Sequence, residues 1–214
     1  MKYWKQILII LSICLTCMIA LTSLLCAAMW ISLHFFDGNQ APPLSGQEHQ
    51  LRQDMVREAQ QWLGTGEGTD GHTEIISIYN THEPLAQGYE VKSADNWCAA
   101  FGSAVAIRCG RTDIVPTECG CERQIGLWKQ MNRWEETDSY RPLPGDYIYY
   151  NWDADWDPKD NTGWADHVGI VVGTAGPAIK VIEGNRDDCV MYRVIFRWDH
   201  RIRGYGLPDY ASIQ

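Results

Sequence analysis

The chain opens with one long apolar run, residues 7–36, which holds no Lys, Arg, Asp or Glu. A helix of this length reaches about 45 Å, more than the roughly 30 Å hydrocarbon core of a bilayer. Because Lys2 and Lys5 precede the run and Asp37 follows it, the positive-inside rule predicts a short cytoplasmic N-terminus at 1–6 and a single transmembrane helix. The alternative is a long signal peptide. However, the run exceeds the usual apolar region of about 7–15 residues, and no clear A-x-A site ends it.

Polar and apolar positions beyond the run predict a linker followed by helices. Residues 37–50 contain Gly, Pro and polar residues typical of a linker, so we expect a folded domain over 51–210. Apolar spacing within and near that domain predicts helices over 47–63, 98–110 and 118–134. Asp95 or Asn96 is expected to cap the second helix and Thr117 the third. Residues 65–96 are expected to be irregular.

The pattern changes after the third predicted helix. Pro144-Gly145-Asp146 predicts a turn, and β-branched or aromatic runs predict strands over 147–150, 167–173, 180–183 and 190–198, with a closing segment at 202–210. Helices followed by an antiparallel sheet define the α+β class, with the helices packed on the sheet.

Composition supports a globular domain and excludes one class of function. Of the 214 residues, 45% are hydrophobic and 21% are charged, as in ordinary globular proteins. The formal net charge is −9. An acidic domain repels phosphate backbones, so nucleic acid is not an expected partner.

Cysteine usage is informative because the predicted outer domain holds an odd number. Three of the eight cysteines lie in the apolar run, and five follow it: Cys98, Cys109, Cys119, Cys121 and Cys189. In an exported domain, four of these can form two disulfides while one stays free. If Cys98 is the free thiol, the other four allow three pairings.

Cys98 lies at the start of a predicted helix. Backbone N–H groups and the helix dipole stabilise a thiolate there, and the thiolate is the nucleophilic form of cysteine. A backbone N–H at the same place could hold an oxyanion. A buried structural cysteine or half of a disulfide is the alternative on position alone.

His167 opens a predicted strand. A hairpin turning near residue 175 would place residue 183 opposite residue 167, and residue 183 is Glu. Asn185 lies two positions further on the same face. Either side chain could accept the imidazole N–H and set its tautomer, as the third member of a catalytic triad does. A strand-end histidine beside a solvated glutamate is the alternative.

Four motifs, in order, resemble those of the CHAP domain (cysteine, histidine-dependent amidohydrolase/peptidase), a relative of the NlpC-type cell-wall peptidases. They are Trp97-Cys98-Ala99-Ala100-Phe101, Pro144-Gly145-Asp146, Asp166-His167-Val168-Gly169-Ile170-Val171 and Val181-Ile182-Glu183-Gly184-Asn185. The resemblance implies a papain-like fold, Cys98 as nucleophile, His167 as general base and Glu183 as the residue that orients it. It also implies that Asn185 assists at the histidine or at the oxyanion.

The same resemblance implies a peptidoglycan hydrolase that cleaves an amide or peptide bond through a thioester, without a metal or organic cofactor. With the transmembrane helix, we expect a single-pass membrane protein whose catalytic domain is extracellular and has peptidoglycan as its partner. Cleavage of the apolar run would instead give a secreted enzyme. The alternative functions are a cysteine hydrolase of a non-wall amide and a non-catalytic wall-binding module.

The loop before His167 carries two weaker signals. Asp153, Asp155 and Asp157 alternate as calcium ligands can, but no Gly stands at the sixth position of that loop and no Glu at the twelfth. A solvated acidic loop is therefore preferred, and no metal site is predicted. Trp152 and Trp164 in this loop, with Trp97, could line a substrate groove, or they could fix the loop to the domain.

Overall fold

The computed structural model describes residues 44–152 and 163–213. All elements described below belong to one compact unit, Ser45–Gln214. The predicted transmembrane helix at 7–36 and the aspartates at 153, 155 and 157 lie outside the described residues. Among the helices that the structure describes, none combines the length and apolar character needed to cross a membrane.

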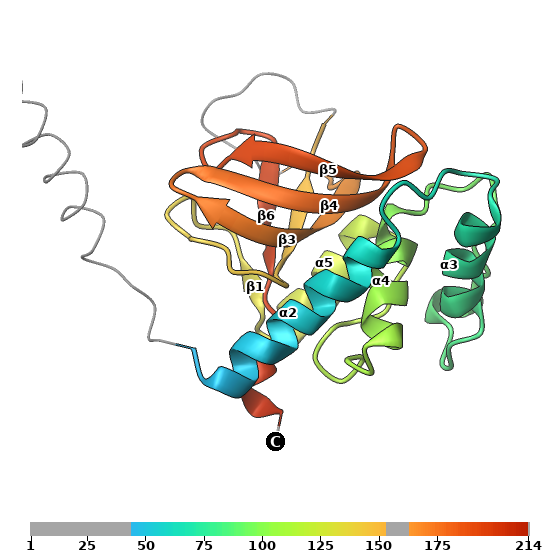
Figure 1. The fold of residues 1–214 in the computed structure, drawn as a ribbon, viewed down its shortest axis with the longest axis horizontal. Helices are drawn as coiled ribbons and strands as arrows, with labels where there is room; N and C mark the ends of the chain where they lie inside the picture. The colour runs from blue at the N-terminus through green and yellow to red at the C-terminus, as the bar shows by residue number, and fades with distance from the viewer. Residues whose placement is uncertain (1–43, 153–162, 214) are drawn as a thin grey trace, which may run out of the picture. The chain divides into compact units, whose positions relative to one another are not determined.

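The described part of the unit contains helices followed by strands (Figure 1). The helices are α2 (Gly46–Gln61), α3 (Asp70–Asn80), α4 (Cys98–Arg108) and α5 (Cys121–Gln130), with 3-10 turns η1 (Ala86–Gly88) and η2 (Tyr210–Ser212). The strands are β1 (Trp134–Glu135), β2 (Tyr147–Tyr150), β3 (His167–Ala175), β4 (Ala178–Arg186), β5 (Cys189–Phe196) and β6 (Ile202–Gly206). The predicted α+β class is confirmed.

All six strands form one antiparallel sheet in the order β1-β6-β2-β3-β4-β5. Helices α2 and α4 pack on the sheet, and α3 packs on α4. In Figure 1 the helices lie together on one side of the sheet. Helix α4 contacts β3 and β4, the strands that carry His167 and Glu183, and this packing brings the nucleophile candidate to them.

Strand β2 shows why the sheet has two apolar faces. Its four residues are fully buried although side chains alternate between faces. Tyr147 and Tyr149 join the core beneath the helices, whereas Ile148 and Tyr150 join a second cluster with residues of β3 to β6. Because both faces of this central strand are buried, its sequence is continuously apolar and does not alternate with polar residues.

Helix α3 was missed in the segment predicted to be irregular. Thr69 caps it by accepting a hydrogen bond from the His72 N–H at 3.3 Å. Its buried positions include Ile75, Ile76 and Tyr79. This apolar stripe is too narrow to stand out in a polar stretch, and packing against α4 is what stabilises the helix.

The predicted caps of α4 and α5 were wrong, whereas the start of α2 was predicted to within one residue. Helix α2 begins at Gly46, next to its predicted start at 47 and inside the predicted linker, and Ser45 caps it by accepting a hydrogen bond from the Glu48 N–H. Trp97, not Asp95 or Asn96, precedes α4, and no side chain caps that end. Helix α5 begins at Cys121 instead of 118.

The start of α5 depends on a buried carboxylate. The side chain of Glu118 accepts hydrogen bonds from the N–H groups of Cys119 and Gly120, at 2.8 and 3.2 Å. It therefore supports the segment just ahead of the helix in place of the expected cap, Thr117. Helix α5 consequently begins at Cys121.

The hairpin register also differs from the prediction. The ladder pairs Ile170 with Ile182 and, beyond a bulge, Ala175 with Ala178. Residues 167 and 183 are thus not directly opposite one another. Their side chains still meet, because diagonal neighbours on antiparallel strands lie within reach of long side chains.

Candidate active site

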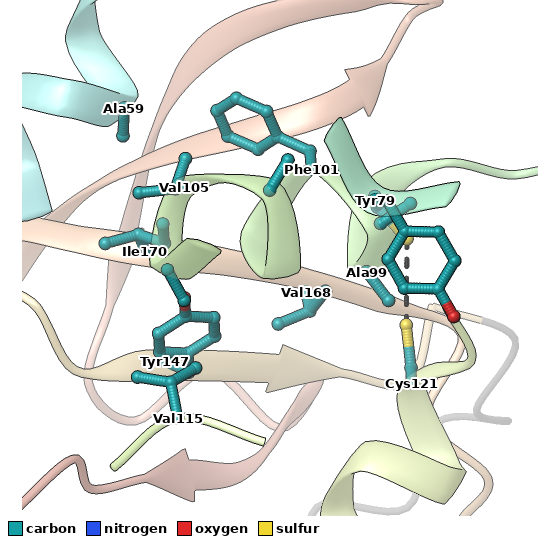
Figure 2. Packing of buried hydrophobic residues seen from close by; sticks show 14 of the residues in the cluster. Ala59, Tyr79, Ala99, Phe101, Val105, Val115, Cys121, Tyr147, Val168 and Ile170 are labelled. Carbon is teal, nitrogen blue, oxygen red and sulfur yellow. Dashed lines mark hydrogen bonds between the residues drawn. The ribbon is translucent and has the colours of Figure 1, made fainter. Parts of the chain in front are cut away.

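Helix α4 positions Cys98 by packing unusually close to the sheet. A Cβ at Gly184 would lie 2.5 Å from the Phe101 Cβ, and one at Gly102 would lie 2.9 Å from the Tyr147 ring. Glycine is therefore required on both sides of this contact. Figure 2 shows Phe101 and Val105 of α4 among the residues of this core, with Val168 and Ile170 of the sheet beside them.

The Cys98 sulfur lies among three groups that stabilise its anion. The Cys121 sulfur is 3.6 Å away, a contact drawn as a dashed line in Figure 2. The Cys121 hydrogen bond is the main cause that lowers the pKa of Cys98 well below its usual range, against the opposing effect of burial. Hydrogen bonds from His167 and the Val168 backbone N–H lower it further. Because Cys98 is also the first residue of α4, the helix dipole favours its thiolate.

His167 connects the sulfur to a carboxylate. Its Nε2 lies 3.2 Å from Glu183 Oε2, so Nδ1 is the ring nitrogen left for Cys98. Burial alone would lower the pKa of His167, but its contacts with Cys98 and Glu183 raise it to about 10. The arrangement is a buried thiolate–imidazolium pair backed by an acid, which suits nucleophilic attack followed by proton donation.

Glu183 is fully buried and pairs with a second cationic side chain, Arg193, which the sequence did not predict. Arg193 Nε lies 2.6 and 2.9 Å from its two carboxylate oxygens. Burial raises the pKa of Glu183, but the hydrogen bonds from His167 and Arg193 outweigh it and keep the pKa below its usual value. The antiparallel pairing of β4 with β5 brings Arg193 near Glu183, and no sequence motif marked it.

The other predicted site residues lie around this centre. Asn185 has a positive φ of 55°, and its amide donates to Asn96 at 3.4 Å. It therefore lies beside the segment that leads into Cys98 and is not hydrogen-bonded to His167. The Trp152 ring is contacted by the guanidinium groups of Arg193 and Arg201, which lie 4.3 and 4.7 Å from its centroid.

Two of the three predicted groove tryptophans have contrasting positions. Trp164 is 73% exposed. Trp97 is completely buried, packs on His72, and donates to Glu67 at 3.2 Å. The prediction that Trp97 lines a substrate groove is therefore wrong, because a side chain without solvent access belongs to the core.

The disulfides that the cysteine count allowed are absent from the described residues, where all five cysteines of the domain are free thiols. Cys121 faces Cys98 instead of one of the other three. Cys109 and Cys189 have backbone carbonyl partners at 3.9 and 3.7 Å. Within the described part of the chain, no cluster of three or more His, Cys, Asp or Glu residues could hold a metal ion.

A comparison with protein-family models agrees with the resemblance derived from the motifs. Residues 86–185 match the family model of the CHAP domain, a segment that includes Cys98, His167, Glu183 and Asn185. The CHAP resemblance is thus confirmed over these residues, and it implies a hydrolase. No curated protein matches the sequence.

Two solved structures are similar at low sequence identity. One is titled "The crystal structure of Ly7917", with 12% identity and a TM-score of 0.45, covering 74% of this chain and 62% of that one. The other, "The crystal structure of Ly7917 with the hydrolyzing product of MDP", has 12% identity and a TM-score of 0.42, with coverage of 73% and 62%. This chain therefore spans less than two thirds of the length of Ly7917.

Proposed function

We propose that this chain, which matches the CHAP domain over residues 86–185, is a peptidoglycan hydrolase that cleaves an amide or peptide bond with Cys98 as its nucleophile. The observation that carries the proposal is the contact chain from Cys98 through His167 to Glu183. A sulfur at a helix start, paired with an imidazole and a buried carboxylate, is an arrangement for acyl transfer. Its position within the CHAP segment favours a wall substrate.

In the acylation step, the Cys98 thiolate attacks the carbonyl carbon of the scissile amide. The first N–H groups of α4 have no acceptor within the helix, so they are candidates to bind the developing oxyanion. The His167 imidazolium then gives its proton to the leaving amine as the C–N bond breaks. A thioester on Cys98 and a free amine result.

In the deacylation step, neutral His167 takes a proton from water, and the hydroxide attacks the thioester carbonyl. The C–S bond breaks, the product acid leaves, and the thiolate–imidazolium pair is restored. Glu183 keeps the ring oriented throughout, and Arg193 holds the carboxylate at both oxygens.

The test is digestion of purified sacculi by the full chain and by Cys98→Ala. We expect the parent to release soluble fragments and the variant to release none, while both keep the same circular dichroism spectrum. Cys109→Ala is the matched control, because its thiol lies outside the Cys98 contacts, and it should digest like the parent. Digestion by Cys98→Ala would refute the proposal.

Analysis of the fragments identifies the bond. An N-acetylmuramoyl-L-alanine amidase frees the amino group of the first stem residue, whereas an endopeptidase frees one within the stem or the cross-bridge. Labelling new amino groups before acid hydrolysis distinguishes these products. Both results are consistent with the same Cys98 chemistry, and the result selects the substrate subclass.

We also propose that residues 7–36 hold the domain at the outer face of the cell membrane. The basis is the uncharged run between Lys5 and Asp37. Fractionation of producing cells should recover the full-length chain with membranes, accessible to added protease from outside. Recovery of a shortened, soluble chain would refute the membrane anchor and favour a cleaved signal peptide.

A further inference from the structure

A second thiol sits against the nucleophile. The sulfurs of Cys98 and Cys121 are 3.6 Å apart, and both residues are buried. In the hydrolytic steps Cys121 forms no covalent bond and transfers no proton; its hydrogen bond only stabilises the Cys98 thiolate. Two thiols at this separation need to approach by only about 1.5 Å to reach the length of a disulfide bond, about 2.05 Å.

The surroundings make the two thiols unequal. Cys98 has His167 and the Val168 N–H as further partners, whereas the pKa of Cys121 is raised well above its usual value by its hydrogen bond to Cys98 and by burial. Cys98 is therefore the thiolate and Cys121 the thiol that donates to it. The thiolate is the form of cysteine that attacks a peroxide, and a neighbouring thiol then resolves the sulfenic acid that results.

The geometry points to Cys121 as a resolving cysteine that joins Cys98 in a reversible disulfide when a hydroperoxide oxidises the active site. The inference builds on the proposed function, in which Cys98 is the nucleophile. It adds a covalent modification site to the catalytic centre and a chemical class of reactant, small peroxides.

The chemistry balances in two steps. The Cys98 thiolate attacks one oxygen of hydrogen peroxide, the O–O bond breaks, and sulfenic acid and hydroxide form. Cys121, deprotonated as it reacts, then attacks the Cys98 sulfur, and the S–O bond breaks to release water once the hydroxyl is protonated. The two thiols together lose two electrons and two protons, and the peroxide is reduced to two waters.

The consequence is a nucleophile that is masked but preserved. Sulfenic acid without a thiol neighbour is oxidised further to sulfinic acid, which thiol reductants do not reverse. A disulfide stops that progression and returns to the active thiol pair on reduction. A second thiol beside the nucleophile would therefore protect a wall hydrolase exposed to oxidants outside the cell.

The experiment treats the full chain, purified in mild detergent, with hydrogen peroxide and maps the cysteines by mass spectrometry without reduction. Tryptic cleavage separates Cys98, in peptide 93–108, from Cys121, in peptide 112–123. We expect these peptides to be cross-linked, with a loss of about 2 Da in the intact protein. Cys121→Ser should show no cross-link. Its Cys98 peptide should instead gain about 32 Da, the mass of the two oxygen atoms that convert a thiol to a sulfinic acid.

Cys119→Ser is the matched control, because Cys119 lies in the same tryptic peptide as Cys121. It should keep the cross-link, and dithiothreitol should reverse the mass change in this variant and the parent but not in Cys121→Ser. Absence of the 93–108 to 112–123 cross-link in the parent, or its survival in Cys121→Ser, would overturn the inference.

The cross-link is measured without any wall substrate, so it is independent of the proposed function. If the disulfide forms but the reduced protein does not digest sacculi, the hydrolase proposal fails and the thiol pair stands. If sacculi are digested but no cross-link forms, the reverse holds. Where both hold, peroxide should lower the wall-digesting activity of the parent and of Cys121→Ser. Dithiothreitol should restore the activity of the parent but not that of Cys121→Ser.

Discussion

Replacement of Glu183 by Gln would isolate the contribution of the buried carboxylate to the His167 charge. The substitution keeps the shape of the side chain but removes its negative charge, while Cys98 still faces the ring. His167 has a pKa raised from 6.5 to about 10 despite burial, with Cys98 and Glu183 as the two raising groups. The rise corresponds to roughly 5 kcal/mol in favour of the imidazolium, at about 1.4 kcal/mol per tenfold change in acidity.

The magnitude expected for the variant follows from the contact distance. An opposite charge within about 4–6 Å shifts a pKa by about 1 to 3 units, and His167 Nε2 lies 3.2 Å from Glu183 Oε2. Because the carboxylate raises the pKa of His167, its loss should lower that pKa to about 7–9. The imidazolium that protonates the leaving amine would then disappear at a lower pH.

Two measurements check this expectation. An NMR titration of the His167 ring, assigned by comparison with His167→Ala, gives the pKa directly. The pH profile of dye release from labelled sacculi should show its alkaline limb near pH 10 in the parent and at lower pH in Glu183→Gln. The rate at neutral pH should also fall by about 10²- to 10⁴-fold, because the ring loses its orienting group.

Glu74→Gln is the matched control, because the Glu74 side chain is 57% exposed and pairs only with Arg108 in the described part of the chain. The His167 ring in this variant should have the same pKa as in the parent. A ring pKa in Glu183→Gln within about half a unit of the parent value would refute the reasoning, since the expected shift is at least about one unit.

Two further substitutions test the packing that supports the site. Arg193→Met keeps an unbranched side chain but removes the hydrogen bonds to Glu183 at 2.6 and 2.9 Å, so the free energy of unfolding in urea at pH 7 should fall by about 1.5–3 kcal/mol; stability equal to the parent would contradict the buried pairing. Gly184→Ala should cost about 1–3 kcal/mol in the same assay and reduce sacculus digestion, because the added Cβ would lie 2.5 Å from the Phe101 Cβ and push α4 from the sheet. An unchanged unfolding midpoint would show that α4 does not pack as closely as described.

Much of the fold followed from periodicity. The alternating and β-branched runs predicted strands β2 to β5. Helix α3 and the start of α5 were not predicted correctly, because contacts distant in sequence stabilise them. α3 depends on packing against α4, and a buried Glu118 carboxylate holds the segment before α5. Local helix propensity does not include contacts with residues distant in sequence, so it could not predict these two features.

The site shows the same division. The contact between His167 and Glu183 was predicted from a hairpin, although the observed register is different. The tolerance arises because long side chains reach diagonal neighbours across a sheet. Arg193 escaped prediction because its role depends on the pairing of a third strand, β5.

The amino-acid sequence by itself determined the class of the fold, the order of its elements and the residue types of a cysteine–histidine–acid site, because periodicity and motif spacing are local properties of the chain. Only the tertiary structure decided that Trp97 is buried in the core and that Arg193 donates hydrogen bonds to Glu183. It also decided that Cys121 contacts Cys98 instead of another cysteine. These outcomes depend on how α4, α5 and the sheet pack together. Packing follows from the shapes and volumes of many side chains at once, so it cannot be read from the spacing of any few.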